Sequence, residues 1–160
     1  MFTLALLTGL AQAQEKEPYD HTFSLTNSPL QLLLPVMEVT GEYRLDDRIG
    51  FGGIGSIGAS FGIPVAAIGP TFRYYPVGDF DHGMQLGADL QFVVAATEVN
   101  GRIITATGAG FGPFIGYKIA ARFGLTFEIQ GGVGVTGVQG GGETFITPLP
   151  VLNLNLGWSF

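Results

Sequence analysis

The chain has 160 residues, of which only 12% are charged, with a net charge of −6 and no cysteine. The lack of cysteine excludes disulfides, thiolate zinc sites and thiol nucleophiles, and the acidic balance disfavours nucleic acid, which binds basic surfaces. The sequence is glycine-rich and apolar, with a mean hydropathy of +0.37, but it lacks the run of about 18 apolar residues that a membrane-spanning helix needs.

The first segment, "MFTLALLTGLAQA", is an apolar run with the length of a signal-peptide core. It ends on Ala11-Gln12-Ala13, which has the small-x-small form of a cleavage site, although no Lys or Arg precedes the run. The polar segment "QEKEPYD" follows at once, which disfavours a buried first strand. We therefore expect a signal peptide over residues 1–13 and a mature chain over 14–160.

Apolar and polar residues alternate along the rest of the chain, which predicts β-strands because successive strand side chains point to opposite faces. The first of these segments changes phase around Asn27-Ser28-Pro29, which predicts a bulge or bend there. Phe114 is an exception to the alternation of its segment, and Asn100-Gly101 is a strong hairpin signal. The expected strands cover residues 22–34, 36–45, 49–61, 65–76, 84–97, 102–117, 121–136 and 149–160.

The last expected strand shows most clearly that one face of the strands is apolar and the other polar. Leucines, Trp158 and Phe160 occupy one face, and Asn153, Asn155, Gly157 and Ser159 the other. A soluble lipocalin-like barrel would carry many Lys and Glu on its outer, polar face, whereas here that face is mostly Gly, Asn, Ser, Thr and Gln. An outer-membrane barrel instead turns its apolar face to lipid and its small polar residues into a narrow lumen. The sequence therefore predicts an all-β fold, an eight-stranded antiparallel up-and-down transmembrane β-barrel.

Aromatic residues support this orientation, because they lie near strand ends on the apolar face, where interfacial girdles form. They are Tyr43, Phe72, Tyr74, Tyr117, Phe123, Trp158 and Phe160.

The terminal "LNLNLGWSF" resembles the C-terminal assembly signal of the small eight-stranded outer-membrane β-barrel proteins of Gram-negative bacteria. The segments "VTGEYRLDDRIGFG", "TFRYYPVG" and "GPFIGYKIAARFGL" are similar to strand–turn–strand segments of such barrels. The resemblance implies a bacterial outer-membrane location, periplasmic termini, and two partners: outer-membrane lipid and the β-barrel assembly machinery, which would recognise Leu156, Trp158 and Phe160. We expect a monomer. The resemblance implies no particular activity.

Charged residues on the polar face are the best functional lead, since unpaired charges in a tight interior are costly and should form a network. The predicted lumen network comprises Glu38, Glu42, Arg44, Arg73, Asp89 and Glu128. We expect it to fill and rigidify the barrel, with a gated pore as the alternative.

Catalytic chemistry has no evident centre in the sequence. The only histidines are His21, near the expected mature N-terminus, and His82, in an expected turn, and neither completes a triad pattern. Asp79, Asp81 and His82 could hold a metal, but a solvated turn explains them better. We therefore expect no enzyme, cofactor or metal, and a structural or interaction role. The alternatives are a narrow channel or lipid-modifying enzyme and, third, a soluble ligand-binding barrel.

Overall fold

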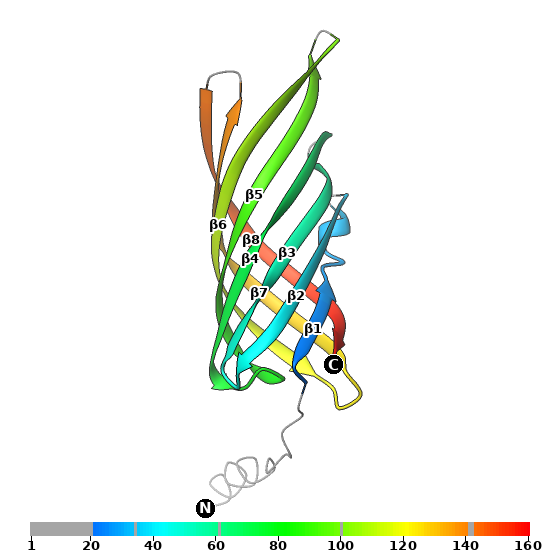
Figure 1. Cartoon of the computed structure of the whole chain (residues 1–160), viewed down its shortest axis with the longest axis vertical. Coiled ribbons are helices and arrows are strands. Elements are labelled where there is room, and N and C mark those ends of the chain that lie inside the picture. The colour runs from blue at the N-terminus through cyan, green and yellow to red at the C-terminus, as the bar shows by residue number, and fades with distance from the viewer. Residues whose placement is uncertain (1–20, 34, 61, 100, 141–142) are drawn as a thin grey trace, which may run out of the picture.

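The computed structural model describes residues 21–33, 35–60, 62–99, 101–140 and 143–160, so the predicted signal peptide lies outside the described residues. Each strand pairs antiparallel with the next, and the first pairs with the last, so the sheet closes into a barrel (Figure 1). This confirms the predicted all-β, eight-stranded up-and-down fold. The strands are β1 (Phe23–Asn27), β2 (Val36–Asp46), β3 (Ile49–Ser60), β4 (Ile63–Gly78), β5 (His82–Val99), β6 (Arg102–Ala120), β7 (Leu125–Gly140) and β8 (Glu143–Ser159).

The barrel is apolar outside and polar inside. In β8, Leu152 and Trp158 are exposed on the outer wall, whereas Asn153 and Asn155 are buried in the interior. The same alternation holds along the other strands, as the period of two requires. Among the described residues, the buried apolar side chains are only Ile54, Tyr75, Phe80, Phe114 and Ala120.

The first strand is much shorter than predicted. β1 ends at Asn27, and the chain continues into a 3-10 turn, η1 (Gln31–Leu33), instead of bulging and running on to residue 34. Pro29 has no N–H to donate to a ladder, and its carbonyl accepts the N–H of Leu32 in the turn. The predicted bend is therefore the end of the strand.

The last strand is longer than predicted. β7 and β8 form a hairpin that stays paired up to Gly140 and Glu143. The prediction that one strand ends at residue 136 and the next begins at residue 149 is therefore wrong. The β5–β6 and β7–β8 hairpins extend beyond the other strands at one end of the barrel (Figure 1). Cross-strand pairing holds these extensions together although their own alternation is weak.

At the other end of the barrel, which we call the closed end, lie the β2–β3, β4–β5 and β6–β7 turns together with Phe23 and Phe160. The β4–β5 turn folds over this end, and the backbone N–H of Phe80 donates to the carbonyl of Asp47 at 2.9 Å. Both Phe80 and Tyr75 are fully buried there. These two aromatic side chains lie inside the barrel next to the closed end, with their ring centroids 6.1 Å apart.

Candidate functional site

Four charged side chains from four strands meet inside the barrel, and we call them the ion cluster. They are Glu42 of β2, Arg73 of β4, Lys118 of β6 and Glu128 of β7. Arg73 Nη1 donates to Glu42 Oε2 at 3.1 Å and to both carboxylate oxygens of Glu128 at 2.9 Å. Lys118 Nζ lies 2.9 Å from Glu42 Oε2 and 3.8 Å from Glu128 Oε1. All four are buried, and their formal charges cancel.

Neutral donors complete the hydrogen bonding of the two carboxylates. The Tyr75 hydroxyl donates to Glu42 Oε1 at 2.8 Å. The amides of Gln130 and Asn155 donate to Glu128 Oε2 at 3.1 and 3.2 Å. A buried ion pair is tolerated when such additional hydrogen bonds satisfy its remaining lone pairs. Both carboxylates of the cluster are therefore well hydrogen-bonded, whereas Arg73 Nε is buried without a hydrogen-bond partner among the described residues.

Aromatic rings lie against both cations of the cluster. Lys118 Nζ is 3.6 Å from the centroid of the Phe80 ring, and the Arg73 guanidinium carbon is 5.9 Å from that of Phe114. Phe114 lies on the inward face with Lys118, as the alternation of its strand requires. Gly87 beside it leaves room for the ring, since a Cβ on Gly87 would lie 2.3 Å from Phe114 Cζ. The rings and the ion cluster together pack the interior next to the closed end.

The predicted lumen network divides into three parts. The structure brings Glu42, Arg73 and Glu128 together in the ion cluster. It places Glu38 and Asp89 apart from them, on the wall of a cavity. Arg44 lies near the closed end, 3.7 Å from the exposed carboxylate of Asp47.

Sequence reasoning missed Lys118 and Tyr75. The signal for Lys118 was available, since Tyr117 was assigned to the outer face and the next residue of a strand must point inward. The same rule applies to Tyr75, because Tyr74 before it was assigned to the outer face. Both side chains are fully buried in contact with Glu42.

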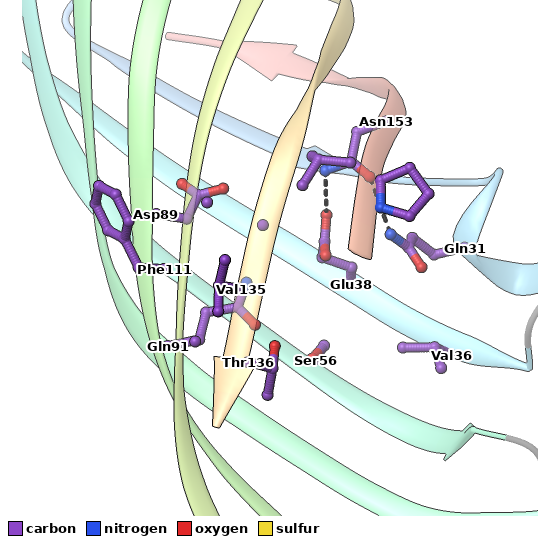
Figure 2. A pocket seen from close by; sticks show the side chains of 15 residues that line it. Gln31, Val36, Glu38, Ser56, Asp89, Gln91, Phe111, Val135, Thr136 and Asn153 are labelled. Carbon is purple, nitrogen blue, oxygen red and sulfur yellow. Dashed lines mark hydrogen bonds between the residues drawn. The ribbon is translucent and has the colours of Figure 1, made fainter. Parts of the chain in front are cut away.

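A cavity of about 230 Å³ occupies the interior on the side of the cluster away from the closed end. Figure 2 shows the residues that line it. Asn153 Nδ2 donates to Glu38 Oε1 at 3.2 Å, and Gln31 Nε2 donates to Asn153 Oδ1 at 2.9 Å. No Lys or Arg of the described residues lines it. Its polar lining is Gln31, Glu38, Ser56, Asp89, Gln91, Thr136 and Asn153.

The acidic residues of the β4–β5 turn serve the turn itself. Asp79 Oδ1 accepts the backbone N–H groups of Asp81 and His82 at 2.9 and 2.8 Å. Asp81 Oδ1 lies 3.0 Å from His21 Nδ1, and burial raises the pKa of the Asp81 carboxyl above its ordinary value. Over the part of the chain that the structure describes, no group of three or more His, Asp or Glu is placed to hold a metal ion.

The three residues of the predicted assembly signal lie on the outer wall. Leu156, Trp158 and Phe160 are all exposed there. The Trp158 ring lies 5.8 Å from that of Phe123, and the Phe160 ring stacks on that of Phe23 at 6.4 Å. Their recognition by the assembly machinery stays a prediction.

Comparison of the chain with models of known protein families, with curated proteins and with solved structures gives no match. Among the described residues, no helix has the length and apolar character needed to cross a membrane.

Proposed function

We propose that this chain is an integral protein of the bacterial outer membrane whose side-chain-filled lumen does not conduct. Its role in this proposal is structural or one of interaction. The observation that carries the proposal is the inverted distribution of side chains, with exposed Leu, Ile, Val and Phe on the strands and buried charges within. Contiguous apolar patches beyond a few hundred Å² are rare on soluble monomers.

Energetics favour lipid as the medium around this wall. Moving one large apolar side chain out of water is worth about 1.5–3 kcal/mol, and every strand of the barrel exposes such residues. Backbone groups in lipid must be paired internally, and a closed ladder achieves this along most of the wall. A soluble ligand-binding barrel would need the opposite distribution.

Aromatic residues on the outer wall support the same orientation. They are exposed close to the closed end, where a girdle would contact the membrane–water interface. The girdle residues are Tyr43, Tyr74, Tyr117, Phe123 and Trp158. Together with the resemblance of the C-terminal segment, this supports a periplasmic closed end. In the proposal, the protein acts as a monomer among outer-membrane lipids after insertion by the assembly machinery.

The packed interior favours a plug over a channel. The ion cluster and Phe80 obstruct the lumen next to the closed end, and the cavity lies on one side of them only. The proposal therefore assigns no conductance to the wild-type chain. It assigns no catalytic activity either, because Asp81 pairs with His21 and Asp79 with the turn backbone.

Fractionation and reconstitution test these claims separately. We expect the chain in the outer-membrane fraction after carbonate and urea washes, with heat-modifiable gel migration, and no single-channel conductance in planar bilayers beside a general porin as the positive control. Recovery in the soluble fraction would refute membrane integration. Reproducible conductance would instead support the narrow channel, and altered lipid A in expressing cells would support the enzyme.

A further inference from the structure

The barrel wall is incomplete between β1 and β8. The β7–β8 ladder extends from Trp158 to Glu143, whereas β1 pairs with β8 only from Ser159 to Leu156. Beyond Leu156, the edge of β8 that faces away from β7 therefore has no strand partner among the residues that the structure describes. The turn η1 lies beside the start of β2 at this position (Figure 1). We call the interruption the β1–β8 gap.

Two prolines sit on the unpaired edge. The N–H of Phe160 donates to Phe23 on β1, and the N–H of Ser159 donates to Gly124 on the opposite side. Because successive residues of a strand alternate in direction, even-numbered residues of β8 face the β1 side. Pro148 and Pro150 are even-numbered and bring no N–H to this edge. An edge that carries proline resists pairing with another strand, so the gap is unsuited to a β-strand partner.

The cavity meets the gap. Gln31 and Val36 line the cavity from one rim of the gap, and Pro150, Val151 and Asn153 line it from the other. The hydrogen bond from Gln31 Nε2 to Asn153 Oδ1, 2.9 Å long, crosses between the rims (Figure 2). A single neutral hydrogen bond contributes only about 0.5–1.5 kcal/mol. The rims can therefore separate without loss of the ladder.

The gap lies at the height of the apolar belt. Residue 152 is six positions from Trp158 in the girdle, which corresponds to about 20 Å along a strand at about 3.3 Å per residue. A strand tilt of about 40° reduces this to about 15 Å above the girdle, inside a belt about 25 Å tall. In a membrane the gap would consequently open toward lipid tails rather than toward water.

The chemistry of the cavity selects a cation. Its two carboxylates, Glu38 and Asp89, belong to none of the ion pairs formed by the described residues. The ion cluster is neutral as a whole, and the attraction of its Arg73 for Glu38 and Asp89 is offset by its own carboxylates. The remaining polar groups of the lining are amides and hydroxyls, which can accept hydrogen bonds. An ammonium group, which carries only donors, complements this lining.

An apolar hollow runs along the outside of the same seam. It has a volume of about 440 Å³ and is lined by Leu25, Val39, Leu156 and Trp158 among others. It lies between the girdle and the point where the β1–β8 ladder stops, at Asn27 and Leu156. An alkyl chain in this hollow would point away from the gap toward the closed end.

We propose that the cavity binds the ammonium headgroup of a single-chain membrane amphiphile, which enters sideways through the β1–β8 gap while its alkyl chain lies in the outer hollow. The inference rests on the proposed membrane location. A cavity of about 230 Å³ holds a small headgroup and not a whole lipid, which is why the chain stays outside.

The binding test uses the full barrel reconstituted in phosphatidylcholine nanodiscs, with dodecylammonium as the probe and the NMR signal of the Gln91 side-chain amide as the readout. We expect saturable shifts with dodecylammonium and none with dodecanoate. The double variant Glu38→Gln/Asp89→Asn should bind at least tenfold more weakly. Asp47→Asn is the matched control, since it removes an exposed acid outside the cavity, and it should bind as the wild type does. Equal affinity of the cavity variant, equal shifts with dodecanoate, or equal weakening by Asp47→Asn would each overturn the proposal.

The entry route is tested by closing the gap. The chain has no cysteine, so Gln31→Cys/Asn153→Cys can be joined selectively with a short bis-maleimide linker. The cross-linked barrel should lose dodecylammonium binding at least tenfold relative to the same variant before cross-linking. Undiminished binding, or equally tight binding of chainless ethylammonium, would refute entry from the membrane. A barrel that fails to insert would refute the proposed function, whereas one that inserts but gives no shift would refute only this inference.

Discussion

Removal of the Arg73 charge is the strongest test of the ion cluster. In Arg73→Met, an apolar side chain replaces the guanidinium, so Glu128 loses its contacts of 2.9 Å and the cluster changes from neutral to a net charge of −1. Breaking a buried ion pair by removal of one partner costs about 3–5 kcal/mol, because the remaining charge is left uncompensated. We expect the free energy of unfolding to fall by that amount. The assay is reversible urea unfolding in phospholipid micelles at neutral pH.

A second variant separates charge from packing. Arg73→Met/Glu128→Gln restores neutrality, because Lys118 then pairs with Glu42 alone, and it should be more stable than Arg73→Met by about 1–3 kcal/mol. Arg48→Met is the matched control, since Arg48 is exposed, and exposed charge pairs contribute about 0–1 kcal/mol. If Arg73→Met lowers the free energy of unfolding no more than Arg48→Met does, or if Glu128→Gln only adds to the loss, the cluster does not stabilise the barrel by charge pairing.

Three further outcomes are expected. Gly87→Ala should destabilise the barrel by about 1–3 kcal/mol, because its Cβ would overlap the Phe114 ring, and Phe114→Leu should partly suppress the loss in the same urea assay. Burial raises the native pKa of the Asp81 carboxyl, so the native state binds this proton more tightly than the unfolded state does. The free energy of unfolding should therefore fall as pH rises from about 4 through the raised pKa. Asp81→Asn should remove this part of the pH dependence, as measured by urea unfolding at a series of pH values. A chain that lacks Phe160 should still refold in micelles, since burial of one aromatic side chain contributes only about 1.5–3 kcal/mol. In cells it should reach the outer membrane poorly. Normal outer-membrane levels on fractionation would refute the role of Phe160 as an assembly signal.

The alternation of apolar and polar residues was sufficient to assign residues to the outer or the inner face of the barrel. It placed Glu42, Arg73 and Glu128 inside before any strand pairing was known, and the same rule applied to Tyr117 would have added Lys118. The period of two is a local property of extended backbone, so it is readable in sequence. Phe114 is an apolar residue on the inward face, and the room for its ring comes from another strand, namely from the absence of a side chain at Gly87.

The positions of strand ends depend on partners that the sequence does not display. β8 begins at Glu143 because β7 pairs with it, although the segment from residue 143 contains two prolines and little alternation. β1 ends at Asn27 although leucines follow it. The inward turn of Phe80 likewise needs the carbonyl of Asp47 from a different turn. The cavity and the gap result from these strand ends, which is why the sequence did not reveal them.

The ion cluster and the β1–β8 gap are mechanically connected through Ser24. This buried residue of β1 pairs with Ser159 in the short ladder, and its hydroxyl accepts a hydrogen bond from Lys118 Nζ at 3.1 Å. Since four ladder pairs and the backbone hydrogen bonds between Phe23 and Phe160 hold β1 to the C-terminal strand among the described residues, this contact anchors a strand that a short ladder secures weakly. A packed, charged interior near the closed end thus lets the barrel tolerate an interrupted wall farther along the seam. Loss of the cluster should therefore loosen the seam at β1 before it affects the long β5–β6 hairpin.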